Sequence, residues 1–172
     1  MINTRTVLLA VLFVAFCGSF AFAADPAASG TWKTFFPDGL LNAKGEPVGI
    51  EQLGNKIVGI YYSAHWCPPC RAFSPKLVEF RNAHKDDFEI VFVSSDKGEK
   101  EQFGYMSDLK MEWLTMKYQS PAAEALKTKY NVEGIPTLII LSPKGETISQ
   151  DGRGDVTNSP DTCLDTWKKA IK

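Results

Sequence analysis

Two cysteines that directly follow an apolar run, at positions 67 and 70, constrain this chain more than any other feature. The run Ile57–Ser63 is rich in β-forming side chains and apolar enough for a strand that is buried on both faces. After the cysteines, Phe73, Leu77 and Phe80 recur at spacings of four and three, which is typical of a helix. The sequence therefore predicts a strand, a Cys-x-x-Cys turn and a helix, in that order.

A Cys-x-x-Cys pair at the start of a helix suits thiol–disulfide exchange. The unpaired N–H groups and the positive end of the helix dipole stabilise a Cys67 thiolate. Cys70 follows one turn later, where it can resolve a mixed disulfide formed at Cys67. Pro69 has no N–H, so it withholds one donor from the Cys67 sulfur and favours a reducing pair, whereas Arg71 acts in the opposite direction.

Two other interpretations of the cysteine pair are a structural disulfide and a zinc site. A disulfide across two residues closes so small a loop that it constrains little of the unfolded chain. Zinc needs a second pair of ligands, and the only histidines are His65 and His84, the latter in the last turn of its predicted helix. We expect no metal and no bound cofactor, only a redox-active Cys67–Cys70 disulfide.

The pattern along the rest of the chain predicts an α/β fold. Strands are expected at 32–36, 57–63, 88–94, 137–141 and 147–150, an irregular hairpin at 40–48, and helical segments at 50–53, 68–84, 97–110, 121–130 and from 159 onward. Two β-helix-β connections followed by a hairpin and a closing helix predict one mixed sheet with helices on both faces.

The residues around the cysteines resemble a known family. The run 66–71, Trp-Cys-Pro-Pro-Cys-Arg, is similar to the active site of the thioredoxin-like superfamily, in the form found in its tryparedoxin and nucleoredoxin branch. Segments 62–65, 73–77, 91–96 and 113–114 are similar to the same branch, and 134–138 resembles the turn where an Ile-cisPro-Thr segment faces the dithiol. The similarity covers about residues 50–154.

The resemblance implies a thioredoxin-like fold and a thiol–disulfide oxidoreductase that reduces or exchanges protein disulfides. It implies Cys67 and Cys70 as the catalytic pair, and a substrate-binding groove formed by Trp66, Pro68, Pro69, Ile135 and Pro136. A cis bond before Pro136 would leave the Ile135 backbone free to pair with an extended substrate. The alternatives are a packed core position for Trp66 and an ordinary trans proline that begins an edge strand.

The chain also departs from the family pattern. Thioredoxins have a buried aspartate six residues before the first cysteine, where this chain has Tyr61. The proton acceptor for Cys70 is therefore open, with water and Asp96 as candidates. We expect the additional segment 97–120 to lie close to the rim of the site. Cys163, four residues before Trp167 on one helix face, is either a buried apolar position or a third redox thiol.

Two rival functions follow from the same fold. A peroxide reductase of this fold carries its cysteine in a Thr-x-x-Cys setting, and here Ala64 stands in place of the threonine. The second rival is a non-catalytic thioredoxin-like binding module whose disulfide is structural.

The N-terminus resembles a secretory signal peptide. Arg5 precedes an apolar run at 7–16 that is too short to span a bilayer, and small residues fit a cleavage site after Ala23. We expect a signal peptide at 1–23, a flexible leader at 24–31, a domain at 32–172, and export to a periplasm or by a eukaryotic secretory route. An uncleaved membrane anchor and lipid attachment at Cys17 are the alternatives.

Composition limits the partners. The net charge of −1, with no basic cluster, excludes nucleic-acid binding as a main function. The mature chain is long enough to bury its own core, so the cysteine pair is not needed as reinforcement. We expect a monomer without membrane insertion, a protein or small-thiol disulfide as substrate, and a separate electron donor.

Overall fold

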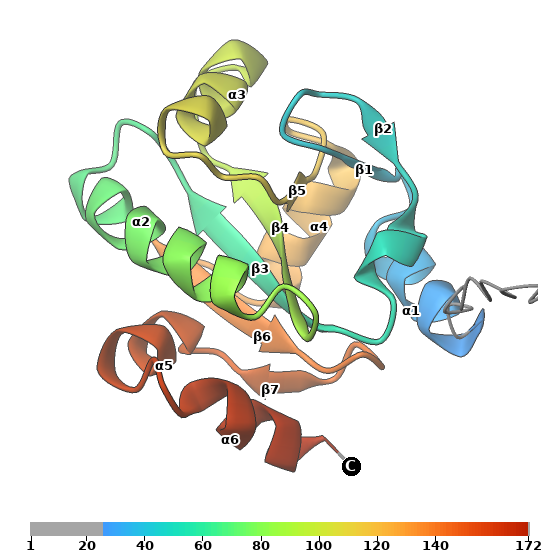
Figure 1. Ribbon diagram of the computed structural model, residues 1–172. Helices are drawn as coiled ribbons and strands as arrows, with labels where there is room; N and C mark the ends of the chain where they lie inside the picture. Colours follow the sequence, from blue (N-terminus) through green and yellow to red (C-terminus); the bar gives the residue numbers. More distant parts are fainter. Residues whose placement is uncertain (1–25, 172) are drawn as a thin grey trace, which may run out of the picture.

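The computed structural model describes residues 26–171, with side chains from Gly30 onward. Within this range the strands form one sheet in the order β2-β1-β5-β4-β3-β6-β7 (Figure 1). The strands are β1 (Leu40–Leu41), β2 (Pro47–Val48), β3 (Ile57–Ser63), β4 (Phe88–Ser94), β5 (Leu114–Thr115), β6 (Thr137–Leu141) and β7 (Thr147–Ser149). The helices are α1 (Pro26–Phe35), η1 (Ile50–Leu53), α2 (Pro68–Ala83), α3 (Glu99–Asp108), α4 (Pro121–Lys129), α5 (Gly152–Asn158) and α6 (Cys163–Ala170).

The sheet is mixed, and helices cover both of its faces. β3 pairs parallel with β4 and antiparallel with β6, and β4 pairs parallel with β5. Helices α1 and α4 contribute to the apolar cluster on one face, whereas α2, α3, α5 and α6 contribute to the cluster on the other (Figure 1). The predicted thioredoxin-like architecture is confirmed.

The central strand β3 has every residue buried, as its continuous apolar run predicts. Its side chains alternate, so that Val58 and Ile60 join the α1/α4 cluster while Ile57 and Tyr61 join the cluster beneath α2. Gly59 sits where a Cβ atom would lie 2.9 Å from Phe88 Cζ. A larger side chain there would force the neighbouring strand aside.

Helix α1 corrects the prediction at the start of the domain. The strand expected at 32–36 is wrong, and residues 26–31 of the expected leader belong to the same helix. Trp32, Phe35 and Phe36 are three and one apart, a spacing that fits a helix face as well as an irregular strand. Their burial in one apolar cluster with Leu53 of η1 decides the outcome, and the Trp32 indole N–H donates to the Gly54 carbonyl at 3.3 Å.

Two short elements, β5 and α5, were not predicted from the sequence. β5 lies in a segment expected to be a connection, and only its pairing with β4 and β1 makes it a strand. α5 contains two glycines and an asparagine, which are poor helix formers. Its first turn is stabilised because the Asp151 carboxylate accepts the Gly154 N–H at 3.0 Å.

The other predicted elements are confirmed within a few residues. The helix after the dithiol ends at Ala83 with His84 as its cap, and Pro75 lies inside it. Ser120 caps α4, where its hydroxyl accepts the Ala123 N–H at 3.3 Å. No helix in the range 26–171 is long and apolar enough to cross a membrane.

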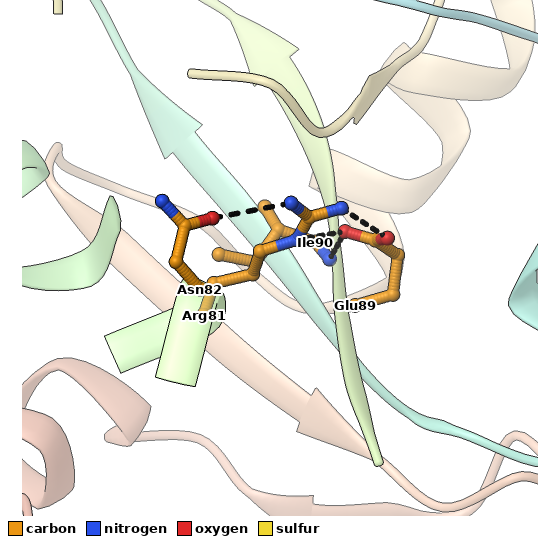
Figure 2. Close-up of polar contacts among 4 residues, drawn as sticks. All are labelled: Arg81, Asn82, Glu89 and Ile90. Atoms are coloured by element: carbon orange, nitrogen blue, oxygen red, sulfur yellow. Dashed lines mark hydrogen bonds and ion pairs between the residues drawn. The ribbon is translucent and has the colours of Figure 1, made fainter. Parts of the chain in front are cut away.

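A largely buried ion pair fixes the last turn of α2 to β4 (Figure 2). Arg81 donates from Nε and Nη2 to the two carboxylate oxygens of Glu89, at 2.9 and 2.6 Å. Glu89 also accepts the Ile90 N–H at 2.8 Å, and Arg81 Nη1 donates to the Asn82 side-chain oxygen at 3.2 Å. The helix that begins at the dithiol is thus anchored at its far end.

Replacement of Glu89 should destabilise the fold because it leaves the Arg81 charge buried without a partner. We expect Glu89→Ala to lower the free energy of unfolding by about 3 kcal/mol, measured by urea denaturation. As a control, Asp87→Ala breaks the exposed pair with Lys168 and should cost less than about 1 kcal/mol. Equal costs for the two variants would contradict a structural role for the buried pair.

Candidate active site

The cysteine pair lies where β3 passes into α2. Cys67 occupies the N-cap position with extended backbone angles, φ −90° and ψ 110°, and Pro68 is the first helical residue. Proline is favoured there because its fixed φ suits the helix and its missing N–H has no partner to lose. Cys67 and Cys70 are joined in a disulfide, with their Cα atoms 5.2 Å apart.

The first free backbone donor of α2 points to the Cys67 sulfur. Because Pro68 and Pro69 have no N–H, the first helical residue that can donate is Cys70, whose N–H lies 3.3 Å from Cys67 Sγ. Arg71 N–H donates to the Cys67 carbonyl at 3.1 Å and begins the helical ladder. A thiolate at Cys67 would therefore receive one direct hydrogen bond and the field of the helix terminus.

The two cysteines differ in access. Cys70 is completely buried, and Cys67 is 4% exposed in the disulfide form. Cys67 lines a surface groove of about 500 Å³, whereas Cys70 does not. The sulfur of Cys67 is therefore the one that a substrate in the groove could reach.

The groove brings together residues that are far apart in the sequence. Its lining comprises Trp66, Cys67, Pro68, Pro69, Ser95, Lys127, Val132, Glu133, Gly134 and Ile135. The Ile135–Pro136 bond is cis, as expected, and the Ile135 carbonyl oxygen lies 3.9 Å from Cys67 Sγ. β6 begins only at Thr137, after this turn. Of the residues expected to bind substrate, Trp66, Pro68, Pro69 and Ile135 line this groove, and Pro136 directly follows Ile135.

Trp66 forms an exposed wall of the groove. Its side chain is 57% exposed, which rules out the alternative of core packing. The indole N–H donates to the Ser95 carbonyl at 3.0 Å, so the ring is held against the loop that follows β4. On its other side Trp66 borders a second hollow of about 340 Å³, which Lys97 and Glu101 also line. The segment 97–120 does reach the rim of the site, as expected.

The position of the thioredoxin aspartate and the candidate acceptor Asp96 both carry polar groups with hydrogen-bond partners. Tyr61 is fully buried and its hydroxyl is hydrogen bonded to Ser74 Oγ at 2.8 Å. Burial raises the pKa of Tyr61 far above its ordinary value, so the hydroxyl stays protonated at neutral pH. Asp96 accepts the His65 N–H at 2.7 Å and the Ser94 hydroxyl at 2.8 Å. Both Asp96 oxygens thus have partners that fix the loop before Trp66.

Sequence reasoning missed the hydroxyl groups on the α2 side of β3. Ser74 and Tyr105 are completely buried and hydrogen bonded to each other at 2.7 Å, and Ser63 is hydrogen bonded to Tyr105 at 3.0 Å. One signal was present, since Ser74 lies four residues after Cys70 and so on the same face of the helix. Tyr105 gave no such signal. Within residues 26–171 no group of three or more His, Cys, Asp or Glu side chains could hold a metal ion.

Cys163 occupies an apolar core position on α6. It is 4% exposed, and its sulfur lies 3.9 Å from the Pro160 carbonyl oxygen. Burial, with a smaller contribution from Asp155, raises the pKa of the Cys163 thiol to about 11. The thiol is therefore protonated at neutral pH, which supports a packing role over a third redox thiol.

This environment predicts slow modification of Cys163. In a Cys17→Ser variant with the dithiol oxidised, we expect no maleimide addition to the native protein at pH 8 and stoichiometric addition in urea. The rate in the native state should rise steadily with pH above 8, because the raised pKa keeps the thiolate fraction small at pH 8 and this fraction grows with pH. Peptide mass spectrometry identifies the labelled residue, and equal labelling of native and unfolded protein at pH 8 would contradict this assignment.

The site geometry agrees with comparisons to known proteins. A family model described as thioredoxin-like matches residues 54–147. The chain belongs to the thioredoxin-like family. Mouse (Mus musculus) nucleoredoxin is 42% identical over 132 residues, which cover 74% of this chain and 30% of nucleoredoxin. The chain thus matches less than a third of the length of that relative.

Two solved structures are similar over most of their length. Thioredoxin from Wuchereria bancrofti is 43% identical with a TM-score of 0.65, covering 76% of this chain and 94% of that one. Tryparedoxin II complexed with glutathionylspermidine is 33% identical with a TM-score of 0.70, covering 77% and 94%. The chain is therefore a member of a family of redox proteins that includes nucleoredoxins and tryparedoxins.

The comparisons correct the expected location. Nucleoredoxins are intracellular proteins, and such relatives from mouse and Arabidopsis thaliana contradict the prediction of a periplasmic or secreted protein. The prediction of export is wrong. It came from residues 1–23, which lie outside the described range. A short apolar run followed by small side chains is defined by little more than its hydrophobicity. It is therefore a less specific signal for a compartment than the Cys-x-x-Cys motif is for a family.

Proposed function

We propose that this protein is a thiol–disulfide oxidoreductase that reduces or exchanges disulfide bonds in proteins or disulfides formed from small thiols. The observation that carries the proposal is the position of Cys67, at the N-terminus of α2, beside the Ile135 carbonyl and on the lining of a groove. A structural disulfide would not require a substrate groove beside the more accessible sulfur. Membership of the thioredoxin-like family supports the same reaction class.

The reaction proceeds by two displacements at sulfur. The Cys67 thiolate attacks one sulfur of a substrate disulfide, forms a mixed disulfide and releases the first substrate sulfur as a thiolate, which takes up a proton. Cys70 then loses its proton and attacks Cys67 Sγ, which releases the second substrate thiolate and leaves the Cys67–Cys70 disulfide. The substrate has gained two electrons, and a separate thiol donor returns two electrons to the cysteine pair. No bound cofactor takes part.

The groove suits an extended segment that carries a disulfide. Trp66, Pro68 and Pro69 offer an apolar wall, and the backbone of Ile135 lies outside the β6 ladder, where it can pair with a substrate backbone. Lys127 and Glu133 provide one charge of each sign on the groove lining. All these groups come from one chain, so a single copy of the protein supplies the whole groove. The tryparedoxin II complex with glutathionylspermidine supports small thiols as a further substrate class.

Replacement of Cys70 separates a catalyst from a binding module. We expect Cys70→Ser to stop turnover and to accumulate covalent adducts at Cys67, because the first displacement still occurs and the second does not. Non-reducing gel electrophoresis and mass spectrometry with an insulin substrate would show the adduct. Cys67→Ser is the matched control and should form none. Absence of adducts with retained binding would favour the non-catalytic module.

The direction of the reaction is tested by the reduction potential. We expect a value nearer to about −270 mV than to about −120 mV, since the two prolines leave one direct N–H donor for the Cys67 thiolate and so limit stabilisation of the reduced form. Equilibration with glutathione buffers measures it. An oxidising potential, or peroxide consumption faster than insulin reduction, would overturn the assignment as a disulfide reductase.

A further inference from the structure

Tyr105 joins three chain segments that surround the dithiol. Its phenol is completely buried on α3 and hydrogen bonded to Ser63 Oγ at 3.0 Å and to Ser74 Oγ at 2.7 Å. The face of its ring stacks on the imidazole of His65, with ring centroids 5.1 Å apart and an interplanar angle of 17°. One side chain therefore contacts the end of β3, the second turn of α2 and the loop between them.

These contacts lie close in sequence to both cysteines. His65 is two residues before Cys67, and Ser74 is one helical turn after Cys70. Ser63 is the last residue of β3, directly before the loop. Movement of Tyr105 relative to β3 would therefore be transmitted to both sides of the dithiol.

The loop residue His65 is held from two further directions. Its backbone N–H donates to Asp96 at 2.7 Å, and its Nε2 lies 3.6 Å from the Asp108 carboxylate at the end of α3. The backbone hydrogen bond is partly buried, whereas the Asp108 pair is exposed and contributes little. The stack on Tyr105 is thus the main contact between the His65 side chain and the protein interior.

A packing role alone does not account for Tyr105. A phenylalanine would fill the same volume, yet the structure places a hydroxyl between two buried serine hydroxyls, with Tyr61 as the fourth member of the chain. Burial of hydroxyl groups costs free energy unless each has a partner in a defined geometry. The result is an interior polar network whose bonds have fixed directions, in contrast to the non-directional contacts of the surrounding apolar cluster.

We propose that Tyr105 is a positioning residue for the dithiol. Through Ser74 it fixes the helix turn that follows Cys70, and through His65 it fixes the loop that carries Trp66 and Cys67. The two sulfurs and the exposed Trp66 wall then keep one relative position while the disulfide opens and closes. This role rests on the proposed oxidoreductase function, and it adds α3 to the elements that determine the rate.

The test compares two tyrosine-to-phenylalanine variants. Tyr105→Phe keeps the ring and its stack on His65 but removes the hydrogen bonds to both serines. Tyr62→Phe is the matched control, because Tyr62 is equally buried, points to the opposite face of β3 and has a hydroxyl without a hydrogen-bond partner among the described residues. For both variants, the rate of insulin reduction is measured at a fixed temperature, and the thermal midpoint of unfolding is measured by heating.

A second readout does not depend on catalysis. Of the four tryptophans, Trp32, Trp113 and Trp167 are at most 2% exposed, so acrylamide quenching of fluorescence reports mainly on Trp66. We expect Tyr105→Phe to change the quenching constant and to lower the rate about fivefold, the factor that corresponds to about one net hydrogen bond. Tyr62→Phe should leave both unchanged.

Further variants keep the proposal testable if Tyr105→Phe folds poorly. His65→Ala removes the stack from a partly exposed position and should alter quenching and rate with little effect on the thermal midpoint, whereas His65→Phe keeps an aromatic ring and should restore both. A lower thermal midpoint for Tyr105→Phe, with unchanged quenching and rate, would reduce Tyr105 to a structural role. If the wild type reduces no disulfide, the proposed function fails, and quenching alone still decides whether Tyr105 positions the loop.

Discussion

The start of α2 is the constraint on which the rest of this structure depends. A helix N-terminus leaves backbone N–H groups without partners, and here two prolines reduce these so that the Cys70 N–H, 3.3 Å away, is the first to reach the Cys67 sulfur. The same proline pair sets the backbone angles with which the helix begins. Local geometry and thiol chemistry therefore arise from the same four residues.

The scaffold keeps this helix start in place from several sides. β3 is buried along its whole length and delivers the loop to a fixed point, and the Arg81–Glu89 pair anchors the other end of α2 to β4 (Figure 2). Asp96 holds the loop backbone at His65, and Tyr105 holds its side chain. The site is thus supported by the sheet, by α2 and by α3.

The interior beneath the cysteines is lined by hydroxyl groups. The fully buried position six residues before Cys67 carries a tyrosine whose hydroxyl stays protonated, so it supplies no buried charge beneath the cysteines. The polar groups around it, Ser63, Ser74 and Tyr105, are hydroxyls hydrogen bonded to one another. Where the resemblance to thioredoxins implies a buried carboxyl group, this chain has a network of hydrogen-bonded hydroxyl groups.

The amino-acid sequence by itself determined the parts that depend on local pattern. The apolar run before Cys67, the helical spacing after it and the proline of the Ile135–Pro136 turn were enough to predict the central strands, the dithiol helix and the facing turn. Prediction from the sequence failed where a pattern was short or ambiguous. At 32–36, burial of Trp32 against η1 selects a helix instead of a strand. At residues 1–23, hydrophobicity alone suggested the wrong compartment. Only the tertiary structure decided that Trp66 is exposed and that Asp96 accepts a hydrogen bond from the loop before Cys67. It also decided that Tyr105 of α3 contacts Ser63, Ser74 and His65. These contacts join residues 31 to 42 positions apart, and no local spacing encodes the packing of one element on another.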